Sequence, residues 1–209
     1  MIVGDAILCY ILYIKGVANP MLITHEREKL IDVIIFFSKR TKYCGLTKLF
    51  KLLYFLDFIH FRETGRSVTG LDYYAWEKGP VPRDLFFEIK KSCKNDLKKS
   101  VFISEPSEDE SKRLTTIKSR REFDERFFNK REKRILEELA DIFREAKSDD
   151  MVEVTHLKDL PWDKTKKDKG MNAKIDYLLS LDNSSKRQLS IEEIKIRMEE
   201  MSETWRTLK

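Results

Sequence analysis

Residues 46–65 read LTKLFKLLYFLDFIHFRETG and predict the helix around which the rest of the chain folds. The apolar centre of this stretch is interrupted only by Lys51, Asp57 and His60. A helix that is hydrophobic on nearly all sides is buried among other elements. Gly65 stands where glycine commonly ends a helix in the left-handed conformation. We therefore expect one central, buried helix.

The next stretch, YYAWEKGPVPRDLFFEI at residues 73–89, predicts a short strand, a rigid corner and a helix. Residues 72–76 are of the aromatic kind that strands prefer. Pro80 and Pro82 hold the residues before them out of the helical conformation. Pro82 also suits the first position of a helix, which we expect to continue through a basic stretch to Lys99.

Two further helices are predicted from their first turns. One should begin near His25, with Thr24 as its N-cap and acidic residues close behind. The other should begin after Asn129, because Glu132 stands three residues later and completes a capping-box pattern. Only 7 Gly and 5 Pro occur in 209 residues, which favours helix over a many-stranded fold.

Shorter elements fill the rest of the domain. Residues 114–118 form a candidate strand, and Ser148 caps a helix that we expect to end at Pro161. The stretch WDKTKKDKGMN after Pro161 is predicted to be a basic loop. IDYLLSL, from Ile175, fits either a strand or a helix. The expected fold is mainly α: a compact multi-helix domain with a small β component.

The C-terminal residues 184–209 predict an amphipathic helix. Ser190 and Glu193 form a complete capping box. Apolar residues then repeat by three and four along one face: Ile191, Ile194, Met198, Met201 and Trp205. This seam covers only about two heptads, so we expect it to pack on its own domain. A homodimer or a partner contact is the alternative.

No familiar catalytic or metal-binding motif occurs in the sequence. Three scattered cysteines, Cys9, Cys44 and Cys93, indicate a reducing compartment rather than a disulfide framework. The histidines lack neighbouring ligands at zinc-finger spacing. We expect no metal, no cofactor and no enzymatic activity.

Asp57 and His60 lie three residues apart and so share a face of the central helix. We expect a structural polar pair in the core, satisfied by hydrogen bonds. A general base with its orienting partner is the alternative.

The first twenty residues are apolar, but Asp5 stands where a signal peptide carries positive charge. The apolar run is also shorter than the roughly 20 residues of a membrane-spanning helix. We expect an N-terminal extension, packed on the domain or lying upstream of a true start at Met21, and no membrane association.

The net charge of +5 arises from 41 basic and 36 acidic residues that are interspersed. Basic residues gather between Lys90 and Lys99 and between Arg120 and Arg126, with acidic residues between the two groups. Such runs are usually solvated faces, so nucleic-acid binding is not favoured.

The stretch from Leu46 to Ile89 resembles the core motif of the Panacea, or SocA-like antitoxin, domain. That motif consists of a KLLYxxD helix, a turn of the form tGxxYxAWxxGPVP, and a second helix. Later residues that also fit the motif are Thr155, His156, Trp162 and Asp176. The resemblance assigns residues 21–183 to this domain.

This resemblance implies a helical antitoxin that binds, in the cytoplasm, a cognate toxin encoded by an adjacent gene. A nucleic-acid-binding regulator associated with phage or prophage, or a proteolytic adaptor, is the alternative. Aromatic and arginine side chains dominate protein interfaces, and a rigid corner costs little entropy to dock. The predicted contact residues are Tyr74, Trp76, Lys78, Gly79, Pro80 and Arg83, with Met198, Met201 and Trp205 if the tail faces outward. Aromatic side chains that merely close the end of a core are the alternative at the corner.

Overall fold

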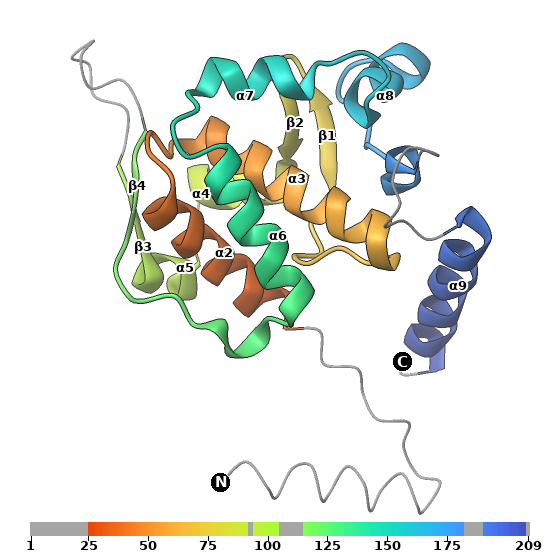
Figure 1. The fold of residues 1–209 in the computed structure, drawn as a ribbon, viewed down its shortest axis with the longest axis horizontal. Helices are drawn as coiled ribbons and strands as arrows, with labels where there is room; N and C mark the ends of the chain where they lie inside the picture. The colour runs from red at the N-terminus through yellow and green to blue at the C-terminus, as the bar shows by residue number, and fades with distance from the viewer. Residues whose placement is uncertain (1–24, 92–93, 105–114, 182–189, 208–209) are drawn as a thin grey trace, which may run out of the picture.

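The computed structural model of the chain describes residues 25–91, 94–104, 115–181 and 190–207. Within these residues it contains eight α-helices and two two-stranded antiparallel sheets (Figure 1). This confirms the predicted mainly α fold with a small β component. The predicted N-terminal extension, residues 1–20, and the predicted N-cap Thr24 lie outside the described residues.

Helix α3, Leu46–Thr64, is the central buried helix that the sequence predicts. It packs against α2 (Glu26–Arg40), α6 (Lys130–Ile142), α7 (Ser148–Thr155) and the first sheet (Figure 1). Its end is the predicted one, since Gly65 has a φ of 76°. Burying one leucine side chain contributes about 1.5–3 kcal/mol. Four leucines of α3 are fully buried: Leu49, Leu52, Leu53 and Leu56.

Helices α2, α6 and α7 begin close to the predicted residues, but only α6 has its predicted N-cap: His25 caps α2 in place of Thr24, and Lys147 caps α7 in place of Ser148. Helix α2 starts directly after His25. Helix α6, which follows the 3-10 turn Glu125–Phe127, has the expected capping box. Asn129 Oδ1 accepts the Glu132 N–H at 3.0 Å, and a carboxylate oxygen of Glu132 accepts the Asn129 N–H at 2.9 Å. The other carboxylate oxygen binds Lys29 Nζ at 2.7 Å, so the capping residue also joins α6 to α2.

The predicted corner is a β-hairpin. Strand β1, Tyr73–Trp76, pairs with β2, Gly79–Pro82, across a two-residue turn. Strand β2 was not predicted, because prolines inside a run argue against a strand. Here Pro80 and Pro82 occupy alternate positions whose backbone faces away from β1, where no N–H is needed for the ladder.

The outer edge of β1 is also paired. Ala75 N–H donates to the Ala173 oxygen at 2.9 Å, and Ile175 N–H donates to the Tyr73 oxygen at 2.8 Å. The backbone groups of Tyr73 and Ala75 therefore face residues 172–175 rather than β2. Strand β1 is held from both sides by segments far apart in the sequence.

The chain after α7 differs from its prediction. Helix α7 ends at Thr155 rather than continuing to Leu160. Pro161 starts α8, Pro161–Lys169, instead of ending a helix, and the predicted basic loop 162–172 is wrong over most of its length. Proline is well suited to the first helical position, where its missing N–H has no intrahelical partner. The lysines of α8 are good helix formers.

The single helix predicted to reach Lys99 is divided in two. Helix α4, Arg83–Lys91, begins one residue after Pro82, and α5 comprises Asn95–Ser100. Strand β3, Val101–Ile103, follows α5 at once.

Strand β3 pairs with β4, Ile117–Ser119, in the second sheet. Strand β4 overlaps the candidate strand at residues 114–118, whereas its partner β3 was not predicted.

The last described elements are the 3-10 helix η3, Tyr177–Ser180, and α9, Ile191–Thr207. The capping box is present at α9, since Ser190 N–H donates to Glu193 at 2.8 Å and Glu193 N–H donates to Ser190 at 3.1 Å. Ile194 is buried. The other side chains of the predicted seam lie outside the described residues: Ile191, Met198, Met201 and Trp205.

Candidate partner-binding site at the hairpin

Aromatic and basic side chains lie together at the β1–β2 hairpin and the adjoining helix α4. The guanidinium carbon of Arg83 lies 4.1 Å from the centre of the Tyr74 ring. The rings of Trp76 and Phe87 are 6.4 Å apart, and Lys91 Nζ lies 5.0 Å from the Phe87 ring. Phe87 is 40% exposed. We call Tyr74, Trp76, Arg83, Phe87 and Lys91 the hairpin face.

The sequence-predicted contact residues separate into two groups. Tyr74 and Trp76 are half-buried, whereas Lys78 and Arg83 are exposed. Gly79 and Pro80 are buried, so they support the face from within rather than reaching a partner.

Phe87 was not singled out from the sequence. The pair Phe86–Phe87 provided the only signal, because adjacent helical residues point in different directions and only one of them can face the core. Phe86 is the inward one: its ring packs edge-on to Trp76 at 5.0 Å and to Phe50 at 6.3 Å.

Lys51 supports the hairpin from the core. Its side chain is 1% exposed, and its Nζ donates to the Pro80 carbonyl at 2.9 Å. This carbonyl lies on the edge of β2 that faces away from β1, where a buried oxygen needs a partner. Burial lowers the pKa of Lys51 to about 7. The sequence marks Lys51 only as an interruption of an apolar run.

Gly79 is required where the hairpin meets α3 and α7. Its φ is 94°, which glycine adopts readily and other residues do not. A Cβ at this position would lie 2.7 Å from Thr155 Oγ1 and 2.9 Å from Lys51 Nζ. Thr155 is fully buried, and its hydroxyl donates to the Met151 and Val152 carbonyls. The motif residues Gly79 and Thr155 are therefore direct neighbours.

His156 and Trp162 close the hairpin from the side of α8. Their rings stack at 3.8 Å with an interplanar angle of 11°, and Trp162 Nε1 donates to the Trp76 carbonyl at 3.0 Å. His156 Nε2 is buried and has no hydrogen-bond partner among the described residues. The pKa of His156 is lowered by burial and by the nearby charges of Lys51 and Lys166.

Asp57 organises the turn that leads into β1. Its carboxylate is fully buried and accepts hydrogen bonds from the backbone N–H groups of Val68 and Thr69 and from the hydroxyls of Thr69 and Tyr73. Burial raises the pKa of Asp57 to about 6, while these donors act in the opposite direction. These four hydrogen bonds join α3 to the turn at residues 68–69 and to the first residue of β1.

His60 does not share these partners. Its Nδ1 lies 2.7 Å from the Arg66 carbonyl, and its Nε2 lies 4.0 Å from the Glu132 carboxylate. Among the described residues, no hydrogen bond joins His60 to Asp57, so the predicted pair consists of two separate polar contacts. Asp176, the last motif residue, caps η3 by accepting the Leu178 N–H at 2.9 Å.

Within the described residues, no group of three or more His, Cys, Asp or Glu side chains is placed to hold a metal ion. Burial raises the pKa of Cys44 to about 11, which keeps this thiol protonated at neutral pH. No helix in the described part of the chain is long and apolar enough to cross a membrane.

These features define a mainly helical domain built on a hairpin that Lys51, Thr155 and Trp162 support from within. The chain belongs to the family described as antitoxin SocA-like, Panacea domain: the sequence model of that family matches residues 49–163, more than half of the chain. The matched range contains the hairpin face and its supports, but neither Asp176 nor α9. No match was found among curated proteins or solved structures.

Proposed function

We propose that this protein is an antitoxin that neutralises a cognate toxin, encoded by an adjacent gene, by binding it in the cytoplasm through the hairpin face. The observation that carries the proposal is family membership, which favours an antitoxin-like role. Neutralisation by binding requires no chemistry, in keeping with the non-enzymatic role that the family favours.

The composition of the hairpin face supports its assignment as the contact surface. Tryptophan, tyrosine and arginine are enriched at the energetic centres of protein interfaces. Tyr74 and Arg83 are already stacked, and Trp76 already packs on Phe86, so little side-chain entropy remains to be lost on binding.

Co-expression with the adjacent gene tests the proposal. Induction of that gene alone should arrest growth, and this chain should restore growth and co-purify with the product. Phe87→Ser and Arg83→Glu change exposed side chains of the face and should weaken both effects. Ile142→Ser is the matched control, because Ile142 is 71% exposed on α6. A neighbouring gene product that is harmless, or toxic but neither relieved nor bound, would refute the proposal.

The amount of toxin in rescued cells distinguishes two forms of neutralisation. If this chain blocks the toxin, the toxin should accumulate in a stable complex. If it delivers the toxin to a protease as an adaptor, the toxin should be depleted, and its half-life should lengthen when the protease is absent.

A nucleic-acid-binding regulator is the competing function. Exposed lysines of α4, of α5 and of the N-cap position of α5 would supply its basic surface: Lys90, Lys91, Lys94, Lys98 and Lys99. That function requires binding to promoter DNA that falls steeply as salt is raised. DNA binding of this kind, without a protein partner, would favour the regulator.

A further inference from the structure

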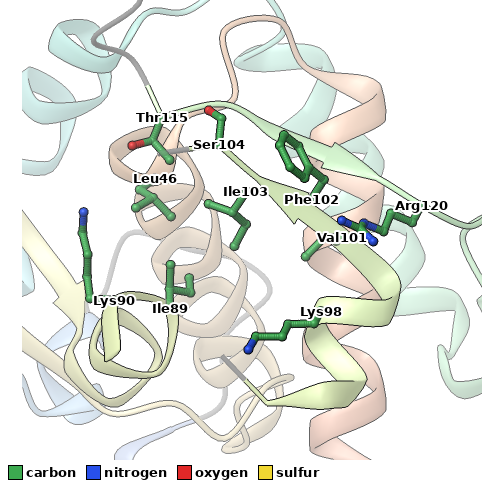
Figure 2. A pocket seen from close by; sticks show the side chains of 10 residues that line it. All are labelled: Leu46, Ile89, Lys90, Lys98, Val101, Phe102, Ile103, Ser104, Thr115 and Arg120. Atoms are coloured by element: carbon green, nitrogen blue, oxygen red, sulfur yellow. The ribbon is translucent and has the colours of Figure 1, made fainter. Parts of the chain in front are cut away.

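A hollow of about 580 Å³ lies between helices α4 and α5 and strand β3 (Figure 2). Its apolar lining comes from Leu46, Ile89, Val101 and Ile103. In Figure 2, Ile89 of α4 and Ile103 of β3 approach the hollow from different elements. We call this hollow the β3 groove.

Among the described residues, one edge of β3 has no neighbouring strand. Arg120 N–H donates to the Ser100 carbonyl at 2.8 Å, and Ser104 N–H donates to the Thr116 carbonyl at 3.0 Å. In an antiparallel ladder these bonds alternate, so Val101 and Ile103 direct their backbone groups away from β4. The Val101 N–H donates a hydrogen bond to the Leu97 carbonyl. Within the described residues, the Val101 carbonyl and both backbone groups of Ile103 have no hydrogen-bond partner.

Basic side chains surround the same groove. Lys90, Lys98 and Arg120 line it and are exposed. In the part of the chain that the structure describes, none of the three forms an ion pair with a carboxylate. Arg120 instead lies 5.6 Å from the ring of Phe102, which is 46% exposed. The groove therefore combines an apolar lining, a positive rim and unused backbone hydrogen-bonding groups.

We propose that the β3 groove binds an extended acidic peptide segment of a partner protein, which adds a third strand beside β3. The free backbone groups would form the ladder, alternate apolar side chains of the peptide would enter the lining, and its carboxylates would face the lysines. This inference goes beyond the antitoxin proposal, because it concerns a different surface and does not depend on the identity of the toxin.

The lining favours a peptide over a nucleic acid. Single-stranded nucleic acids bind to grooves in which several aromatic rings stack successive bases. Of the described residues that line the groove, only Phe102 is aromatic, and the other apolar ones are aliphatic. An open strand edge is, in contrast, a template for another chain.

A selection of short random peptides on the full-length protein tests the inference. Wild type should enrich peptides that alternate acidic and β-branched residues. Lys98→Glu should weaken binding of the enriched peptides about tenfold, because a favourable pair becomes a repulsive one. Lys99→Glu is the matched control, since Lys99 is exposed on the same helix but does not line the groove. It should leave binding within about twofold of wild type.

A second measurement tests strand addition independently of the lysines. N-methylation of alternate amides in an enriched peptide removes the donors that face β3 and should abolish binding, whereas methylation of the intervening amides should be tolerated. The proposal fails if acidic peptides are not enriched. It also fails if the peptides carrying the two alternate patterns of N-methylation bind with the same affinity.

Two results would assign the groove to another occupant. Binding of a single-stranded DNA oligonucleotide that Lys98→Glu weakens, without enrichment of acidic peptides, would make it a nucleic-acid site.

The second test concerns residues 105–110, which follow Ser104 and contain Glu105, Glu108, Asp109 and Glu110. If replacing these four acidic residues with their amides tightened peptide binding, the groove would be occupied by the chain's own acidic segment. That result would contradict the proposal of a partner peptide.

Discussion

The indole N–H of Trp162 donates a hydrogen bond to the main-chain oxygen of Trp76 at 3.0 Å. This bond joins the last residue of β1 to helix α8 across a separation of 86 residues. The two tryptophans therefore differ in role: Trp76 contributes its side chain to the hairpin face, and Trp162 fixes the backbone that carries it.

Replacing Trp162 with Phe should destabilise the fold by about 1–3 kcal/mol, because it removes the donor and part of the packing. His156→Phe should keep the ring stack and remove a buried nitrogen for which the described part of the chain provides no hydrogen-bond partner. We expect its stability to lie within about 0.5 kcal/mol of wild type, or above it. Chemical denaturation of both variants is the measurement. If both variants lost the same free energy of unfolding, the hydrogen bond from Trp162 to Trp76 would make no specific contribution to stability.

Lys51 should make stability depend on pH in a defined direction. Its folded pKa, about 7, is lower than its ordinary value of 10.5. Between these values the unfolded chain binds more protons than the folded chain, so the Lys51 contribution to stability rises with pH. Below pH 7 both states are protonated and the contribution is flat at its lowest level.

Lys51→Met removes this titration and is the reference. From pH 7 to 9 the free energy of unfolding of wild type should rise, relative to Lys51→Met, by up to about 1.4 kcal/mol per pH unit. Denaturant titrations at several pH values measure it. Parallel profiles for the two proteins would contradict a lowered pKa.

Gly79→Ala and Gly170→Ala form a matched pair. Both glycines have positive φ, 94° and 82° respectively. A Cβ at Gly79 would collide with Thr155 and Lys51, whereas a Cβ at Gly170 would meet nothing within 4 Å. Backbone strain alone should cost about 1–3 kcal/mol in each variant, and the collision should add about 1 kcal/mol or more at Gly79. Thermal melts that rank Gly170→Ala as the more damaging change would argue against the close packing.

Asp57→Asn should cost about 2–4 kcal/mol, because an amide nitrogen replaces one of two oxygens that together accept four hydrogen bonds. Asp72→Asn provides the comparison. Asp72 pairs with Lys174 at 2.7 Å, but both side chains are about half exposed, so its loss should cost less than about 1 kcal/mol. Chemical denaturation of both variants at neutral pH measures the two free energies of unfolding. Similar decreases in the two variants would contradict the expectation that the hydrogen bonds of Asp57 stabilise the fold.

The parts of the fold that follow from local pattern could be predicted from the sequence. Helix α3 was predicted because its apolar residues surround the helix, and the start of α6 because Asn129 and Glu132 form their contacts within one turn. Strand β2 was missed because its prolines are tolerated only when their edge faces away from the ladder, a condition set by β1. Pro161 is ambiguous in the same way, since proline can follow one helix or begin the next.

The candidate site was predicted less completely than the fold. Its aromatic and basic residues can be recognised in the sequence. Which residues of the hairpin are exposed on its surface, and which are buried beneath it, cannot. Lys51 reaches Pro80, and Trp162 reaches Trp76, only after α3, α7 and α8 have packed around the hairpin. Such contacts depend on the tertiary arrangement, which neither residue spacing nor periodicity specifies.

The pairing of β1 on both edges has a consequence for synthesis on the ribosome. Strand β2 is available as soon as residue 82 has emerged, but the second neighbour, residues 172–175, is made much later. Until then β1 has an unpaired edge, and Trp162 is absent for most of the interval. The hairpin therefore reaches its final form only after residue 175 has been translated. Chains that terminate before residue 172 should therefore lack the second neighbour of β1 and the completed hairpin.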